Sequence, residues 1–356
     1  MKKVKLICMS AVMALMLSST TFVQAAGNTL DIDNAINKAI ENSYQIKNID
    51  ISIEKAKNDY KEATRGSSGG NADIEAKYSI YQYTNLKEAA KNSVKFNLYN
   101  QYAAFINAKE ALDLETQKFQ NAEAKYKRAQ LQLSLGLIGK PDLKGIEQSY
   151  YNEKSQLDKA KRAFDSVTKN INQLSGSNIG DTYNSFAKDI VEEKPIIKNY
   201  DEYVNDALKY RAEILNDNEN IKVKKLEFDS VRSSGNPYVT SPEYVVGKFA
   251  VTSAENQLET DKIDISIEIN GLYNDLQSKV QKLQSLTTNY NAEKKKYNEA
   301  LQRYNLGMIS KIDFEDSLSS FKGAEDSLKS AQRDVYLSKL KLEYASGIGT
   351  GAQSSN

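Results

Sequence analysis

The sequence predicts an all-α protein built from long antiparallel helical hairpins that pack like coiled coils, with the same unit present twice. Three observations predict this fold class. The chain has 4 prolines in 356 residues, which suits long helices better than compact globules. Two stretches carry an apolar residue at every seventh position. A turn motif centred on glycine occurs at residues 135–143 and again, nearly unchanged, at residues 306–314.

The first 25 residues are expected to be a secretory signal peptide. Three lysines near the N-terminus precede a short apolar run at residues 11–17, and small residues follow at Ala25 and Ala26. This order of basic, apolar and small residues is typical of an exported precursor. The run is too short to cross a bilayer as a helix, and no later stretch is apolar enough to do so. We expect cleavage after Ala25 and an exported protein.

The remaining chain lacks the residues on which most catalytic and metal sites depend. The sequence has no histidine and no tryptophan, and its one cysteine is Cys8. This excludes Ser-His and Cys-His nucleophiles and the usual zinc ligands. Carboxylate chemistry stays open, but nothing singles out one pair among 47 acidic residues. We therefore expect no enzyme, no catalytic residue, no metal and no cofactor.

The net charge bears on possible partners. It is +1 for the whole sequence, so the surface is close to neutral. Binding to nucleic acid depends on the neutralisation of many phosphates by basic residues. We therefore expect no nucleic-acid partner.

The first repeat, residues 26–176, is expected to contain three helices. The opening helix begins at Asp31 or Asp33 and ends at a break rich in glycine and serine, residues 65–72. A helix of roughly 60 residues, ~90 Å long, follows it and ends at a tip at residues 136–141. The third helix leads back from this tip.

The third helix and the last helix of the chain carry the clearest period. Apolar side chains at every seventh position predict a coiled-coil-like seam in both. These positions are Leu143, Tyr150, Leu157, Phe164 and Ile171 in the first repeat, and Phe314, Phe321, Leu328, Val335 and Leu342 in the second.

The second repeat, residues 200–347, follows a linker at residues 177–199. It is expected to show the same order of helix, break, very long helix, tip and helix. Its break lies at residues 233–243 and its tip at residues 307–312. Residues 348–356 are expected to form a disordered tail.

Each tip has the pattern L-G-[LM]-I-[GS]-K-x-D-[LF]. Gly136 and Gly307 can adopt the left-handed conformation that ends a helix. Asp142 and Asp313 then fall in the first turn of the next helix, near the positive end of its dipole. This capping role alone could explain both aspartates.

The tips also carry apolar side chains at positions where a hairpin end is normally polar. Something is expected to cover such side chains. A docking partner and a neighbouring hairpin are both open as explanations. The residues concerned are Leu135, Gly136, Leu137 and Ile138 in the first tip, and Leu306, Gly307, Met308 and Ile309 in the second.

Together these segments resemble the TolC-type outer-membrane efflux proteins. Residues 304–307, followed by Asp313 and then by residues 317–331, are similar to that family's Y-x-x-G…D…A pattern. Residues 30–46 and 200–214 are similar to the starts of its two repeats. The resemblance extends over nearly the whole chain after the signal peptide.

The resemblance implies a homotrimer in which each protomer contributes two hairpins to a hollow α-barrel. Such trimers are passive exit ducts of efflux or secretion systems, and their tips dock onto a periplasmic adaptor that joins them to an inner-membrane pump. The resemblance also implies acidic rings at the entrance, at the places of Asp313 and Asp316. Asp142 corresponds to Asp313 in the first repeat, but Gly145 stands where Asp316 would be.

One departure concerns the two interhelix breaks, where the family inserts β-strands that form a membrane barrel. A strand that crosses a bilayer needs ~9–11 residues, so neither break has room for two. Residues 74–83 alternate only weakly between polar and apolar. We therefore expect a protomer with a reduced β-barrel in the cell envelope. Its place is the outer membrane by resemblance, or an extracytoplasmic position without membrane insertion.

Two functions are consistent with these features. The first is a TolC-like exit duct whose entrance is lined by Asp313, Asp316 and Asp142. The alternative is an envelope structural protein, or one that binds an adaptor through its hairpins, without a pore.

Overall fold

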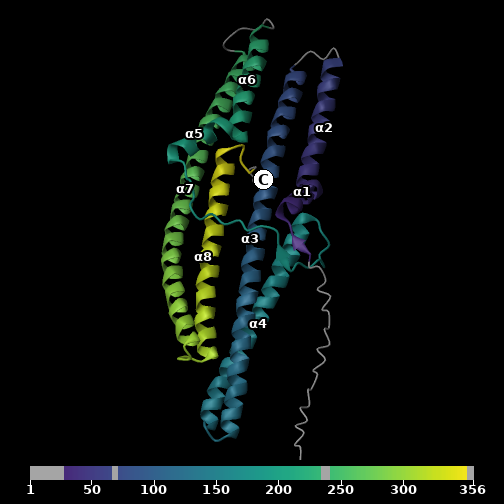
Figure 1. Ribbon diagram of the computed structural model, residues 1–356. Coiled ribbons are helices and arrows are strands. Elements are labelled where there is room, and N and C mark those ends of the chain that lie inside the picture. Colours follow the sequence, from purple (N-terminus) through teal and green to yellow (C-terminus); the bar gives the residue numbers. More distant parts are fainter. Residues whose placement is uncertain (1–27, 66–70, 234–240, 351–356) are drawn as a thin grey trace, which may run out of the picture.

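The computed structural model describes residues 28–65, 71–233 and 241–350, and the all-α prediction is confirmed there. These residues form eight helices and two strands of two residues each (Figure 1). The elements are β1 (Thr29–Leu30), α1 (Ile32–Asn42), α2 (Tyr44–Arg65), α3 (Ala72–Ser134), α4 (Lys140–Ser175), β2 (Ser185–Phe186), α5 (Tyr200–Tyr210), α6 (Ala212–Ser233), α7 (Pro242–Asn305) and α8 (Lys311–Ser346). The expected signal peptide lies outside the described residues.

The four longest helices form an elongated layer in the order α7, α8, α3, α4 (Figure 1). Helix α3 is central, because it contacts α1, α2, α4, α6 and α8. Helix α2 packs on the upper half of α3, and α6 packs on the upper half of α7. This leaves α7 and α4 at the two edges of the lower half.

Side-chain caps define several helix starts. Asp31 Oδ1 accepts a hydrogen bond from the Asp33 amide (2.9 Å) and opens α1. Ser241 Oγ accepts from the Tyr244 amide (3.2 Å), and Pro242 occupies the first position of α7. A proline is favoured there because its missing N–H would have no partner in the helix.

The prediction of one continuous opening helix in each repeat is wrong. The first is interrupted at Ser43, whose φ/ψ of −61°/114° is extended, and the second at Arg211 with −59°/140°. Neither position has a glycine or proline nearby to mark a break. At the first break Asn42 lies against Gly176, where a Cβ atom would come within 2.5 Å of the Asn42 amide nitrogen. Packing against the end of α4 therefore accompanies this break.

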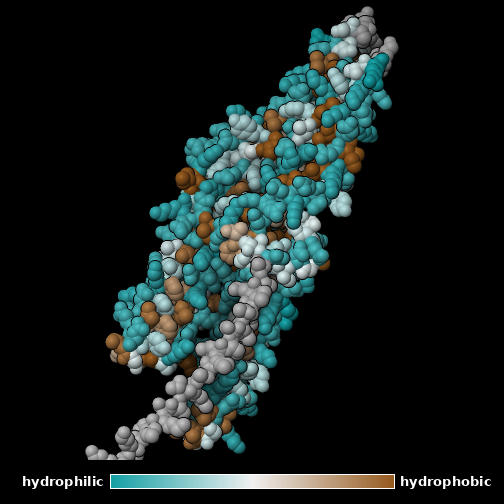
Figure 2. Space-filling model, turned by 45° about the vertical axis from the view of Figure 1, so that its right-hand side comes forward, coloured by the Kyte–Doolittle hydropathy of each residue, from teal (hydrophilic) through white to brown (hydrophobic). Residues whose placement is uncertain are grey.

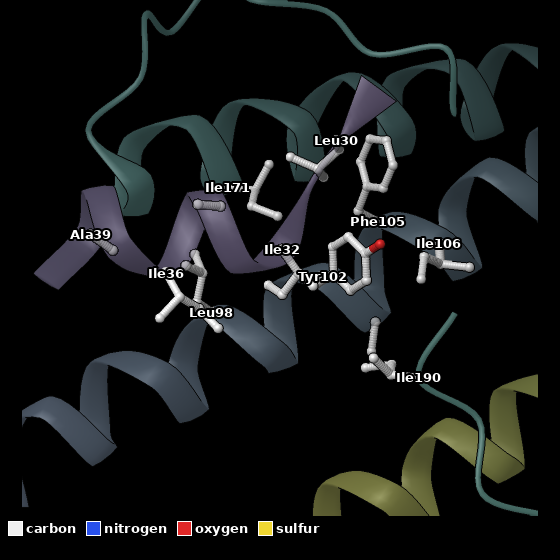
Figure 3. Packing of buried hydrophobic residues seen from close by; sticks show 12 residues of the cluster. Leu30, Ile32, Ile36, Ala39, Leu98, Tyr102, Phe105, Ile106, Ile171 and Ile190 are labelled. Carbon is white, nitrogen blue, oxygen red and sulfur yellow. The ribbon is translucent and has the colours of Figure 1, made fainter. Parts of the chain in front are cut away.

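The interruption at Ser43 lets α1 turn onto α3 and α4 and form a core with them (Figure 3). Tyr102 and Phe105 of α3 are fully buried there, and Ile171 of α4 packs against them. The Tyr102 hydroxyl donates a hydrogen bond to the Lys188 carbonyl. The inter-repeat segment is thus part of this core.

Two short strands were not predicted. β1 and β2 pair in parallel, with Thr29 opposite Ser185 and Leu30 opposite Phe186. A strand of two residues carries no alternation that a sequence pattern could reveal. The pair fixes the inter-repeat segment to the N-terminal end of α1.

A second core joins α5, α7 and α8. Its largest buried members come from α5, from the facing side of α7 and from the seven-residue seam of α8. They are Tyr203, Ile265, Ile269, Leu276, Leu283, Val335 and Leu342.

The two repeats are joined by a buried cation. Arg333 of α8 has no exposed surface. Its guanidinium donates to Asp189 of the inter-repeat segment (2.8 and 2.6 Å) and to Glu110 of α3 (2.6 and 2.9 Å). It also donates to Asn107 Oδ1 (2.6 Å). Burial lowers the pKa of Arg333, but the hydrogen bonds to Asp189 and Glu110 outweigh it, so the pKa lies above its usual value.

The start of the expected disordered tail is ordered. The Ile348 carbonyl accepts a hydrogen bond from the Ala212 amide (3.1 Å), and the Gly349 carbonyl accepts one from Asn92 Nδ2 (3.1 Å). Residues 348–350 therefore tie the end of α8 to α3 and α6. Residues 351–356 lie outside the described residues.

Replacing Arg333 by methionine should destabilise the fold strongly. The substitution leaves the carboxylates of Glu110 and Asp189 without their cation, which costs ~3–5 kcal/mol. Urea unfolding followed by circular dichroism measures this loss. Arg232→Met is the matched control, because Arg232 is exposed and pairs with Asp229 within α6; it should change stability by no more than ~0.5 kcal/mol. Equal effects of the two substitutions would contradict the prediction.

Candidate functional site

The candidate site consists of the two hairpin tips and the polar contacts directly behind them. Gly136 and Gly307 have φ of +71° and +70°. The Leu137 amide donates to the Gln132 carbonyl and the Met308 amide to the Arg303 carbonyl, each at 2.8 Å. The α3–α4 and α7–α8 turns therefore have the same hydrogen-bonded glycine end, in which the left-handed residue favours glycine.

Asp313 acts as a helix cap in the second tip. Its amide donates to Ser310 Oγ (3.2 Å), and its Oδ2 accepts from the Ser310 hydroxyl (2.7 Å) and amide (3.3 Å). Hydrogen bonds from Ser310 hold the pKa of the Asp313 carboxyl below its usual value, and the charges of Lys125 and Arg128 add to this. These hydrogen bonds therefore hold the Asp313 side chain at the first turn of α8.

Asp142 has the corresponding place in the first tip. Its Oδ2 accepts from the Gly139 amide (3.0 Å). Glycine has no hydroxyl, so this cap is made by the aspartate side chain alone. The structure places Asp142 and Asp313 on different tips.

Asp316 has another role, because it points across to the first repeat. It accepts hydrogen bonds from Asn121 and Lys125 of α3. One turn away, Gln117 Nε2 donates to Glu315 (3.2 Å), and Lys322 donates to Gln117 Oε1 (2.8 Å). These contacts form a polar strip that joins α8 to α3.

The α3 partners of this strip were not found from the sequence. Asn121 and Lys125 belong to the other repeat, and no local pattern marks a residue whose partner lies nearly 200 positions away. Asp316 also lies on the wall of a groove of about 550 Å³ between α3, α4 and α8. The groove is lined by Lys118, Asn121, Ala122, Lys125, Ile146, Ser149, Glu153, Asp316, Ser319, Ser320 and Gly323.

The apolar tip side chains are exposed. Leu135 and Leu137 are 63% and 68% exposed, and Leu306 and Met308 are 75% and 65% exposed. Ile138 and Ile309 are half-buried. Figure 2 shows that hydrophobic side chains otherwise form small patches on a mostly hydrophilic surface.

The two tips do not end at the same level. The α3–α4 hairpin extends further than the α7–α8 hairpin (Figure 1). Consistently, Glu315, 8 residues after Gly307, is hydrogen bonded to Gln117, 19 residues before Gly136. Within one chain, the first tip therefore projects beyond the level of the second tip.

Stacked aromatic rings join the two helices of the α7–α8 hairpin. Tyr304 stacks on Phe314 with ring centroids 4.9 Å apart, and Tyr297 stacks on Phe321 at 5.0 Å. These rings join α7 to α8 up to the turn. They pack within the hairpin and do not form a ligand site.

Within the described ranges, the structure offers no cluster of three or more potential metal-binding side chains. Nor does any helix there combine the length and apolar character needed to span a bilayer.

Neither protein-family models nor curated proteins match the sequence. Several solved structures, however, are similar to the protein in fold. The CmeC outer membrane channel of Campylobacter jejuni superposes with a TM-score of 0.65 and 15% identity, over 91% of this chain and 87% of that chain. The chain has the TolC-type fold.

Two further structures show the same TolC-type fold. A membrane protein from Pseudomonas aeruginosa has a TM-score of 0.65 at 13% identity, over 91% of this chain and 92% of that chain. The open-state MtrE outer membrane channel of Neisseria gonorrhoeae has a TM-score of 0.58 at 14% identity, with 91% of each chain covered. In both cases the likeness covers 91% of this chain.

Replacing Ser310 by alanine should loosen the start of α8. The substitution removes the acceptor of the Asp313 amide, and a lost N-cap costs about 1 kcal/mol. Amide hydrogen exchange at Asp313 measures this opening. Ser327→Ala is the control, because the Ser327 hydroxyl bonds only the Gly323 carbonyl in the middle of the same helix. Unchanged protection of Asp313 in Ser310→Ala would refute the capping role.

Proposed function

We propose that this protein is a TolC-like exit-duct component of an efflux or secretion system, a passive conduit in the cell envelope that performs no chemistry. The observation that carries the proposal is the TolC-type fold, which extends over 91% of the chain and 87% of the CmeC channel. CmeC is an outer membrane channel. Energy for transport would come from a pump and not from this chain.

A duct requires several copies, and one exposed side of α7 supports an interface between copies. The side of α7 that points away from its own core is exposed and, apart from Asp264 at its edge, carries no charge over many turns, in a chain with 27% charged residues. Depletion of charged side chains is typical of the centre of a protein interface. The residues of this uncharged α7 face are Val246, Phe249, Ser253, Asn256, Thr260, Ile263, Ile267, Gly271 and Asn274.

Helix α4, at the opposite edge of the layer, has a comparable face. It is exposed and uncharged except for Lys159. Its residues are Gln148, Asn152, Ser155, Gln156, Ala163, Ser166, Asn170 and Gln173. Pairing the α7 face of one copy with the α4 face of the next is a head-to-tail contact, which closes into a ring when the rotation is right.

The tips are the proposed docking points for an adaptor that leads to the pump. Among the described residues, nothing covers the exposed leucines and Met308 of the tips, which favours a partner over the neighbouring hairpin. Behind the second tip, the contact between Asp316 and Lys125 joins α8 to α3. Opening of the entrance by separation of the hairpins would have to break this contact.

Replacing Ile263 by glutamate should prevent assembly. Ile263 is 61% exposed in the monomer, and burial of an unpaired carboxylate in an interface is strongly unfavourable. Sedimentation and negative-stain imaging should show a hollow trimer for the unaltered mature chain and monomers for Ile263→Glu. Ile196→Glu is the control, since Ile196 is 85% exposed in the inter-repeat segment.

An unaltered chain that stays monomeric at every concentration would contradict the duct. It would support the alternative, an envelope protein without a pore that binds an adaptor through its hairpins.

Replacing Asp313 and Asp316 together by alanine should weaken cation selectivity at the entrance. Two carboxylates per copy near the narrow end attract cations and repel anions. Single-channel recordings in planar bilayers should show a lower cation-to-anion permeability ratio. Asp165→Ala is the control, because Asp165 is an exposed acid that pairs with Lys169 along α4. Unchanged selectivity in the double variant would remove the entrance role, and both aspartates would keep only their contacts to Ser310 and Lys125.

A further inference from the structure

Two carboxyl groups meet between α6 and α7. The side chains of Asp217 on α6 and Asp261 on α7 face each other, close enough for one carboxyl to donate to the other if it carries a proton. Asp217 Oδ2 is shielded from solvent, and no protein donor reaches it in the described residues. Ionised carboxylates only accept hydrogen bonds. A contact between two of them is satisfied only when one carries a proton.

The charged groups of α6 around this pair do not supply a cation. Glu213, one turn before Asp217, is held by Arg211 at 2.8 Å. Arg211 also pairs with Glu268 of α7 at 3.0 Å. Glu219 is held by Lys222 at 2.9 Å. Arg211, directly before α6, and Lys222 within it are therefore already paired with carboxylates.

The facing elements add no positive charge either. From α7, Gln257 Nε2 donates to Asp261 Oδ1 at 2.9 Å, and Lys262 pairs with Glu259 at 2.7 Å. From α3, Tyr78 faces the pair, and its hydroxyl pKa is raised by burial and by the charges of Asp217 and Glu219.

The surroundings thus penalise a second negative charge. Burial, the contact with Asp261 and the nearby charge of Glu213 raise the pKa of Asp217 from 3.8 to about 7. Close carboxylates cannot both ionise at low cost, so one of them keeps its proton well above the usual range.

We propose that Asp217 and Asp261 share one proton and form a pH-sensitive clamp between α6 and α7. The clamp is closed while the proton is present. When the proton leaves, two carboxylates face each other without a cation, and α6 loosens from α7. The clamp involves neither the tips nor the edge faces, so it does not depend on the proposed duct function.

The direction of the pH dependence follows from the two pKa values. Asp217 titrates near 3.8 in the unfolded chain and near 7 in the folded one. A raised pKa means that the folded state binds the proton more tightly. The stabilisation is complete below the unfolded value and is lost as the pH rises through about 7.

The loosening is expected to be local. Near the pair, α6 is tied to α3 by one hydrogen bond from Asn85 Nδ2 to Asn216 Oδ1 (2.8 Å). Further along, Lys225 pairs with Glu255 of α7 at 2.9 Å, and both side chains are about half exposed. Arg211 holds the start of α6 to the end of α8 through the Ala345 carbonyl (3.2 Å). The middle of α6 is therefore the segment that responds.

Hydrogen exchange of the mature full-length chain at pH 6 and pH 8 tests the clamp. After correction for intrinsic rates, the opening constant of α6 amides should rise by about tenfold from pH 6 to pH 8, as expected for one group titrating near 7. Asp217→Asn should abolish this rise, because an asparagine amide donates to Asp261 at either pH. Asp229→Asn, an exposed acid on α6 that pairs with Arg232, should retain it.

A second measurement guards against a variant that folds poorly. The side-chain carboxyl resonance of Asp217 in the unaltered protein should titrate with a midpoint near 7. A midpoint near the ordinary value for aspartate, or a tenfold rise that persists in Asp217→Asn, would overturn the proposal. Neither readout requires a pore or a trimer, so its failure is distinct from failure of the duct.

Discussion

The burial of Arg333 is the constraint on which the joining of the two repeats depends. A buried guanidinium must find partners for its charge, and Arg333 finds them on α3 and on the inter-repeat segment. Asp189 can reach it only because β1 and β2 and the Tyr102 hydroxyl hold that segment against α3. One cation thus fixes the place of α8, the path of the connecting chain and the register of α3.

Polar contacts between α8 and α3 continue from this point towards the tips. Lys329 lies 3.8 Å from Glu110, and the strip around Gln117 and Asp316 follows nearer the turn. Apolar heptad seams hold each hairpin together. Towards the tips, charged and amide groups join one hairpin to the other, whereas further from the tips Tyr99 of α3 also packs on Tyr336 of α8. The contact between hairpins can therefore respond to charge more readily than the hairpins themselves.

Most of the fold could be predicted because its signals are local. Seven-residue periods, glycine ends and capping aspartates all lie within one helix or turn, and they located the long helices and both tips. The breaks at Ser43 and Arg211 could not be predicted, because packing against Gly176 and α8 accompanies them without a breaker residue in the sequence. For the same reason the sequence suggested Asp313 as a cap but could not reveal the Lys125 partner of Asp316 or the contact of Asp217 with Asp261.

The offset of the two tips along the long axis of the molecule has a geometric consequence. At this end, a ring of such chains would present tips at two alternating heights and not a flat rim. A partner that approaches along the axis would meet Leu137 first and Met308 only after moving deeper between the projections. Engagement would then proceed in two stages, with the order set by the offset of the tips and not by their chemistry.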